Sequence, residues 1–229
     1  LKYLHRMKHI VERVEILPDE IDLLSKGIHG FLDEEYEVLF IVGGIGPTPD
    51  DITIGAVSKA INHPLIKNKD ALQFIKTQYK KFHAMKIFRT ADIEKVPGAK
   101  KMAFLPQGAK FLTGKGIAPS PYIEYKDCLI FILPGVPSEM KYIFRAHIKG
   151  KLLEPSSYEE FSKEIISKTE EGRLFPILQQ ISSQFPEVKV GSYPSIEKMQ
   201  VVLRIKGEKE KVLKVEKLIR DELKDLGRG

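Results

Sequence analysis

The sequence contains very little cysteine and no long apolar run, and these absences limit the class of protein. Its 229 residues include one cysteine, Cys128, which excludes an internal disulfide and any cysteine-based metal finger. No apolar stretch is long enough to cross a membrane, and the N-terminal residues lack the apolar core of a signal peptide. We therefore expect a cytoplasmic protein with no membrane partner.

The chain also lacks the aromatic–basic surface motif of RNA-binding modules, although it is basic overall. Its net charge is +6 and its pI is about 9.1. The lysines are spread along amphipathic helices, so solvated helix faces explain most of this charge. We therefore expect no nucleic-acid partner, and at most a modest preference for anionic small molecules.

One stretch carries the clearest functional pattern. It runs from the apolar segment Val38–Val42 through Gly43, Gly44 and Gly46 to Thr48-Pro49-Asp50-Asp51. We expect a buried strand, a glycine loop and a helix that begins at Pro49, with Thr48 as its N-cap. Strand ends and helix N-termini of α/β sheets bind phosphates, so this corner predicts a phosphate site to which the glycines give close backbone access.

Asp50 and Asp51 extend this prediction, because phosphate avoids carboxylates unless a cation lies between them. The pair predicts a divalent metal ion that bridges protein and phosphate, and carboxylates accept Mg²⁺, Mn²⁺ or Co²⁺. The alternative is that both aspartates only cap and polarise the first turn of a helix. The local pattern leaves these two interpretations open.

A second strand–turn–helix corner follows the predicted hairpin of Tyr122–Tyr125 and Cys128–Leu133. We expect it to converge with the glycine loop at one edge of the sheet, where Gly135 and Ser138 would border the substrate. Glu139 is a candidate metal ligand or general base, and its alternative is an acid favoured by the dipole of the first helical turn. Ser138 is expected to cap the helix rather than to act as a nucleophile.

The remaining chain alternates helices and strands and divides near residue 150. We expect a helix end over residues 1–8, a strand over Val11–Leu17, helices from Asp19 and over residues 69–83, and an irregular segment over 84–120 with a short strand at Ala109–Leu112. Beyond residue 150 the pattern is strand, helix, strand, strand, helix. This predicts an α/β domain over residues 1–150 and a small β-α-β-β-α domain over 151–229.

Four segments together resemble a known family. They are GGIGPTPDDIT (residues 43–53), KMAFLPQGA (101–109), GIAP (116–119) and LPGVPSEM (133–140), in the order found in the CinA-like branch of the molybdopterin-binding (MoaB/MogA-like) domains. That family also includes the N-terminal domain of eukaryotic FAD synthases. The resemblance implies a three-layer α/β/α domain followed by a smaller α+β domain.

The resemblance also implies a choice of activities. The CinA-like branch is associated with metal-dependent hydrolysis of nucleotide pyrophosphates such as ADP-ribose, the FAD synthase domain with FAD hydrolysis, and the MoaB/MogA branch with adenylylation of molybdopterin. We therefore expect a metal-dependent nucleotide pyrophosphatase. The alternatives are a non-catalytic nucleotide-binding, pterin-binding or oligomerisation module, and a molybdopterin adenylyltransferase-like activity. The family further implies a homo-oligomer, either a dimer or a trimer.

Three departures from the family pattern bear on catalysis. The family usually begins with a strand and a G(D/N)E(I/L)xxG loop, and we expect this strand to be missing because the chain starts inside the helix that follows it. Gln107 stands where the family usually has Glu, and Ser120 stands where it usually has Gly. The missing segment and Gln107 affect the expected catalytic competence more than the expected fold.

Overall fold

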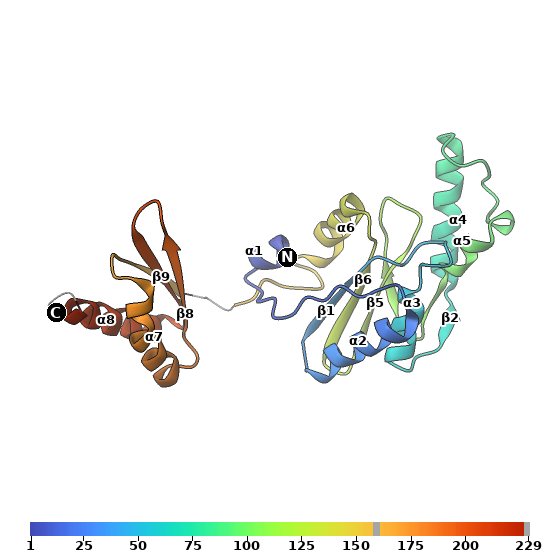
Figure 1. The fold of residues 1–229 in the computed structure, drawn as a ribbon. Helices are drawn as coiled ribbons and strands as arrows, with labels where there is room; N and C mark the ends of the chain where they lie inside the picture. Colours follow the sequence, from blue (N-terminus) through green and yellow to red (C-terminus); the bar gives the residue numbers. More distant parts are fainter. Residues whose placement is uncertain (158–160, 227–229) are drawn as a thin grey trace. The chain divides into compact units, whose positions relative to one another are not determined.

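The computed structural model describes residues 1–157 and 161–226, which divide into two compact units. The larger unit is Glu12–Glu154, and the smaller one combines Leu1–Val11 with Pro155–Gly229. The chain starts with the expected helix, α1 (Lys2–Arg6). Figure 1 shows the path of the chain through the elements of each unit.

The larger unit contains a mixed sheet with helices on both faces (Figure 1). Its elements are α2 (Ile21–Asp33), β1 (Val38–Val42), α3 (Thr53–Ala60), β2 (Leu65–Lys67), α4 (Lys69–Ala84), η1 (Ile93–Lys95), α5 (Pro97–Lys101), β3 (Phe104–Pro106), β4 (Lys110–Leu112), β5 (Ser120–Tyr125), β6 (Cys128–Leu133), α6 (Pro137–Ile143) and η2 (Phe144–Ile148). The main sheet has the order β1-β6-β5-β4, with β1 parallel to β6 and the other pairs antiparallel. Strands β2 and β3 form a separate antiparallel ribbon.

Strand β6 is buried on both faces, and its alternate side chains enter two different layers. Ile130 and Ile132 belong to the core that includes residues of α2, α3 and α4. On the other face, Phe131 stacks on Phe40 with 5.1 Å between ring centroids, and Phe40 lies 5.9 Å from Phe144 of η2. This double burial explains the continuous apolar run in the sequence. The expected α/β/α class is therefore confirmed.

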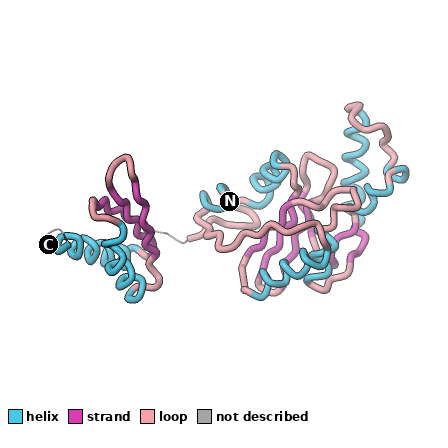
Figure 2. Tube along the Cα trace, in the orientation of Figure 1, coloured by secondary structure: helices cyan, strands magenta, loops and turns pink. Residues whose placement is uncertain are grey.

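The segment Val11–Leu17 is not a strand, so the prediction made from its pattern is wrong. It forms an extended loop, drawn in pink in Figure 2. Within the described residues β1 pairs with β6 alone, and no strand offers a hydrogen-bonding ladder to this segment. Ile16 is 97% exposed, so its side chain gains no packing either. Alternating apolar residues form a strand only where a neighbouring strand can pair with them.

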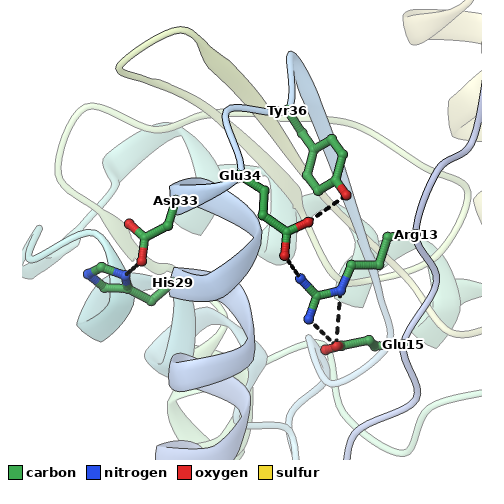
Figure 3. Close-up of polar contacts among 6 residues, drawn as sticks. All are labelled: Arg13, Glu15, His29, Asp33, Glu34 and Tyr36. Carbon is green, nitrogen blue, oxygen red and sulfur yellow. Dashed lines mark hydrogen bonds and ion pairs between the residues drawn. The ribbon is translucent and has the colours of Figure 1, made fainter. Parts of the chain in front are cut away.

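Arg13 fastens this extended segment to the end of α2 (Figure 3). Its guanidinium forms ion pairs with the carboxylates of Glu15 and Glu34. It also lies over the ring of Phe31, with 4.4 Å from the guanidinium carbon to the ring centroid. The hydroxyl of Tyr36 donates a 2.6 Å hydrogen bond to Glu34. Contacts between side chains therefore hold the segment where backbone pairing does not.

The smaller unit is a three-stranded antiparallel sheet packed against two helices. Besides α1, its elements are β7 (Phe161–Ser167), α7 (Glu171–Gln184), β8 (Lys189–Ser195), β9 (Gln200–Gly207) and α8 (Lys209–Leu226), with the strand order β7-β9-β8. Its core combines strand residues such as Leu203 and Ile205 with Val212, Val215 and Ile219 of α8. The predicted order of strands and helices is confirmed. Across the described residues of both units, no helix has the length and apolar character needed to cross a membrane.

Candidate functional site

The two strand–turn–helix corners lie side by side, because β1 and β6 are parallel neighbours. The backbone N–H of Gly43, just after β1, donates a 2.9 Å hydrogen bond to the carbonyl of Leu133 at the end of β6. A Cβ atom on Gly135 would lie 3.4 Å from the Cα of Gly43. The expected convergence of the glycine loop and the second corner at one sheet edge is therefore confirmed.

The glycine loop needs glycine both for its backbone conformation and for its contacts. Gly43 and Gly44 have φ angles of +105° and +65°, which side-chain-bearing residues rarely adopt. A Cβ on Gly44 would lie 2.1 Å from Oγ1 of Thr53. The carbonyl of Gly44 accepts a 3.0 Å hydrogen bond from the Thr53 N–H. The loop thus folds back onto the start of α3 and satisfies one of its free donors.

Helix α3 begins at Thr53 and not at Pro49, so the predicted capping by Thr48 is wrong. The carbonyl of Thr48 instead accepts a 3.1 Å hydrogen bond from the Asp51 N–H, which closes a tight turn, and α5 adds a further contact. Nζ of Lys101 donates hydrogen bonds to the backbone carbonyls of Thr48 and Asp51. A helix that started at Thr48 would use such carbonyls for its own internal ladder. The segment before Thr53 is therefore a loop, and Asp51 does not lie in a first helical turn.

Thr48 and Asp51 close a polar turn instead. Oδ2 of Asp51 accepts hydrogen bonds from the backbone N–H and the hydroxyl of Thr48, at 2.9 and 2.6 Å. Partial burial by itself raises the pKa of Asp51, but the bonds from Thr48, a backbone bond from Gly46 and the charge of Lys101 outweigh it and lower the pKa. Asp51 is therefore ionised at neutral pH, and both Thr48 donors are directed at its carboxylate.

The donor set around Asp50 and Asp51 limits the kind of metal ion that fits. Asp50 is exposed on the loop and Asp51 is half-buried. Among the described residues, no group of three or more His, Cys, Asp or Glu side chains is placed to hold a metal ion. A cation such as Mg²⁺ needs only one or two protein carboxylates, because water and substrate phosphates complete its shell.

Glu139, in the first turn of α6, holds a neighbouring glycine-rich loop. Its Oε1 accepts a 2.8 Å hydrogen bond from the backbone N–H of Gly116. Burial raises the pKa of Glu139, and the bond from Gly116 offsets this only in part. A Cβ on Gly114 would lie 2.7 Å from the same oxygen, so the carboxylate packs directly against this loop.

Ser138 does not cap α6, which corrects a second capping prediction. The N-cap residue is Val136, and no side chain completes the cap. Pro137 takes the first helical position, where its missing N–H is no loss, and this places Ser138 inside the helix. Both Gly135 and Ser138 are exposed at the sheet edge.

The two departures from the family pattern have different surroundings. Ser120 is fully buried, and its hydroxyl donates a 2.5 Å hydrogen bond to the carbonyl of Ile132 in the adjacent strand. Gln107 is exposed, and its backbone carbonyl oxygen lies 2.9 Å from Nδ1 of His63. Ser120 therefore serves the packing of the sheet, whereas the backbone of Gln107 connects the β3 end to the segment that follows α3.

Lys101 belongs to the site, and it opens the family-like segment at residues 101–109, although no role was predicted for its side chain. Its partners Thr48 and Asp51 are 53 and 50 residues away, so only the tertiary fold brings them together. A Cβ on Gly98 would lie 2.3 Å from the carbonyl oxygen of Pro47, which shows how closely α5 packs on the glycine loop. Gly98 and Lys101 are three residues apart, so both lie on the same face of α5, the face that contacts the glycine loop.

Comparison with known proteins identifies families for both units. Residues 1–154 match the family described as "Probable molybdopterin binding domain", and residues 159–226 match "FAD synthase, middle domain". A protein from Pyrococcus abyssi is 34% identical over 212 residues, which are 92% of this chain and 81% of that protein. A protein from Thermococcus kodakarensis is 34% identical over 186 residues, 80% of this chain and 72% of its own length.

Two further comparisons concern CinA-type proteins. A putative competence-damage inducible protein from Natranaerobius thermophilus is 33% identical over 159 residues, which are 69% of this chain and 37% of that protein. The crystal structure of CinA from Thermoplasma acidophilum, a protein of unknown function, matches 63% of this chain and 80% of its own, with a TM-score of 0.55 and 29% identity. The chain therefore belongs to the molybdopterin-binding domain family, in its CinA-like branch.

Proposed function

We propose that this chain is a metal-dependent nucleotide pyrophosphatase that hydrolyses a dinucleotide-type pyrophosphate of the ADP-ribose or FAD class. The convergence of the two corners carries the proposal, because the hydrogen bond from Gly43 to Leu133 places the glycine loop beside the turn that leads to Glu139. The ionised carboxylate of Asp51 follows on the same loop. The match of the smaller unit to an FAD synthase domain supports the dinucleotide class.

The proposal gives each part of the chain a physical role. Gly43, Gly44 and Gly46 have no side chain, so phosphate oxygens could approach the loop backbone closely at these three positions. Asp50 and Asp51 would hold the divalent cation. When bound, such a cation neutralises charge on pyrophosphate oxygens and lowers the pKa of a coordinated water. The described contacts of Thr48 and Lys101 keep Asp51 in position.

Glu139 is the proposed general base at the second corner. Burial raises its pKa, and a carboxylate with a raised pKa is a stronger base for a water proton than an ordinary one. The hydrogen bond from Gly116 fixes the direction of the carboxylate. Gly135 and Ser138 are exposed beside it and would border the substrate.

The test is turnover of ADP-ribose, FAD, NAD and ATP by the purified chain with Mg²⁺, Mn²⁺, Co²⁺ or EDTA. The double variant Asp50→Asn/Asp51→Asn removes the two charges with little change of shape. Asp127→Asn, in the exposed turn between β5 and β6, is the matched control. Metal-dependent cleavage to mononucleotides that the double variant loses and the control keeps would support the proposal. Absence of turnover with all metals from folded protein would refute it.

The description of the matching family favours one second candidate, binding or adenylylation of a pterin. Incubation with molybdopterin and ATP would then release pyrophosphate and form an adenylylated pterin, whereas the proposed hydrolase needs no pterin. Saturable binding of nucleotide or pterin without any turnover would instead indicate a binding or oligomerisation module. Sedimentation of the same samples would test the proposed dimer or trimer.

A further inference from the structure

A cavity lies against the glycine loop, and Gly46 and Asp51 of the proposed site form part of its wall. Its volume is about 300 Å³, which is at the lower end of the range of about 300–1,000 Å³ found for small-molecule sites. Its apolar lining includes Ile21, Ile52, Ile54, Leu65, Met102 and Phe104. These residues come from α2, α3, the β2–β3 ribbon and the segments beside them, so the tertiary fold forms a concave apolar surface there.

Several of these side chains remain open to solvent. Ile21, Leu65 and Phe104 are 44%, 41% and 39% exposed, although all three line the same cavity. Scattered exposed apolar residues are normal on a protein surface, but a concave group of them is typical of a binding site. The occupant should therefore present apolar faces to these walls.

One side of the cavity is polar, and this side is shared with the glycine loop. Gly46, Asp51 and Lys101 line it. The Lys101 ammonium has three donors, of which two bond to carbonyls of the loop, so its hydrogen-bonding capacity is not exhausted by these contacts. The Asp51 carboxylate can accept from ring N–H or amino groups. A free anion is disfavoured here, because it would meet the carboxylate and the apolar walls.

We propose that this cavity binds the flat heterocycle of a nucleotide whose phosphates lie at the glycine loop. Such a ring has apolar faces for the isoleucine, leucine and phenylalanine side chains and a polar edge for Asp51 and Lys101. The cavity volume suits one ring system and not a whole dinucleotide. This inference rests on the proposed function for the position of the phosphates, and it adds the part of the substrate that is recognised.

Gly55 offers a direct way to fill the cavity. It lines the cavity from α3, and a Cβ there would meet Cδ1 of Ile21 at 3.4 Å, the end of a flexible side chain. The added Cβ meets no backbone atom, so we expect the longer side chain of Gly55→Leu to extend into the ring space. Gly30, in α2, does not line the cavity, and a Cβ added there would meet no described atom within 4 Å. Gly30→Leu is thus the matched control.

The experiment measures binding of adenosine, riboflavin and Mg²⁺-pyrophosphate by calorimetry to the native chain and to both glycine variants. We expect adenosine or riboflavin to bind the native chain and Gly30→Leu, and to bind Gly55→Leu at least about tenfold more weakly. The two nucleosides distinguish a purine from an isoalloxazine ring. Pyrophosphate binding should be equal in all three proteins, because it depends on the glycine loop.

The outcomes separate this inference from the proposed function. If neither nucleoside binds the native chain, or if Gly55→Leu binds them as well as the native chain does, the inference is wrong, even where Mg²⁺-pyrophosphate is bound and ADP-ribose or FAD is hydrolysed. If nucleoside binding is lost in Gly55→Leu while none of the three proteins hydrolyses ADP-ribose or FAD in the turnover assay, the ring site stands and the hydrolase proposal fails. A monomer–dimer equilibrium abolished by Gly55→Leu, without nucleoside binding, would assign the cavity to a second copy and overturn the inference.

A second variant covers the case in which Gly55→Leu does not fold. Phe104 is 39% exposed at the rim of the cavity, so Phe104→Glu changes the surface more than the core. Its carboxylate would oppose an apolar ring and should weaken nucleoside binding by about tenfold or more. Unchanged nucleoside binding by this variant would also contradict the inference.

Discussion

Nζ of Lys101 lies 2.6 Å from the backbone carbonyl oxygen of Asp51, 50 residues earlier in the chain. The same ammonium donates to the carbonyl of Thr48, so one side chain from α5 fixes both ends of the polar turn. The orientation of the Asp51 carboxylate therefore depends on packing between the glycine loop and a distant helix. Changes at either end of this contact should alter the stability of the loop and the proposed binding of a metal ion.

Lys101→Met keeps the apolar stem of the lysine and removes its donors. We expect the free energy of unfolding to fall by about 1–2 kcal/mol, because two carbonyls lose a charged partner. Lys100→Met is the matched control, since Lys100 forms an exposed ion pair with Glu94, and exposed pairs contribute little to stability. Urea unfolding of both variants provides the measurement. If Lys101→Met loses no more stability than Lys100→Met, the loop does not depend on the bonds from Lys101.

Alanine substitutions at Gly43 and Gly44 distinguish the cost of backbone strain from the cost of a side-chain clash. Both have positive φ, but a Cβ on Gly43 would meet no described atom within 4 Å, whereas a Cβ on Gly44 would lie 2.1 Å from Thr53 Oγ1. Gly43→Ala should lower the free energy of unfolding by about 1–2 kcal/mol from strain alone. Gly44→Ala should lower it further. Equal values in urea unfolding would mean that Thr53 moves aside without loss.

The bounds of β1 and β6 could be predicted from the sequence because both strands are continuous apolar runs; β6 is buried on both faces, whereas β1 lies at the edge of the described sheet and its Val42 is 55% exposed. Burial on both faces favours apolar residues at every position, and a continuous run with sharp ends marks such a strand. Val38–Val42 and Cys128–Leu133 are the observed strands and also the predicted ones. Convergence of the two corners then follows from parallel pairing of these strands.

The start of α3 could not be predicted in the same way. Thr48 and Pro49 have good local preferences for a helix N-terminus, yet Lys101 binds the carbonyls that such a helix would need. The segment around Ile16 fails for the opposite reason. Its pattern is that of a strand, but the described residues offer it no strand to pair with. In both cases a contact distant in sequence, or its absence among the described residues, decides the local structure.

Glu139 gives a pH-dependent prediction with a defined sign. Burial raises its pKa, so the folded protein holds this proton more tightly than the unfolded chain. Its contribution to stability is fully present below the ordinary pKa of 4.5 and declines as the pH rises from there to the raised value. Glu139→Gln keeps the acceptor for the Gly116 N–H but never ionises. Its stability relative to the native chain should therefore increase across this window.

Urea unfolding of the native chain and Glu139→Gln between about pH 4 and about pH 7 provides this measurement. Glu124→Gln, at an exposed position of β5, controls for loss of one negative charge. The prediction fails if the difference in unfolding free energy between Glu139→Gln and the native chain does not change with pH, or if Glu124→Gln shows the same change.

Asp51 distinguishes a metal-binding carboxylate from a purely structural one. Asp51→Asn retains a side-chain oxygen that can accept from the Thr48 N–H, but it has no charge. Asp51→Ala loses both the acceptor and the charge. We expect Asp51→Asn to change the free energy of unfolding by less than about 1 kcal/mol and Asp51→Ala to lower it by about 1–2 kcal/mol. Both should lose metal-dependent turnover by about 100-fold or more, because a neutral amide is a poor ligand for a divalent cation.

The comparison of these two variants therefore decides between the roles considered for this residue. If Asp51 serves only to close the turn, Asp51→Asn keeps both stability and turnover, and Asp51→Ala reduces the two together. If Asp51 binds the cation, Asp51→Asn keeps stability and loses turnover, and raising the metal concentration restores part of the rate. Turnover with each metal, measured beside urea unfolding of the same preparations, separates these outcomes because the charge and the hydrogen bond are removed one at a time.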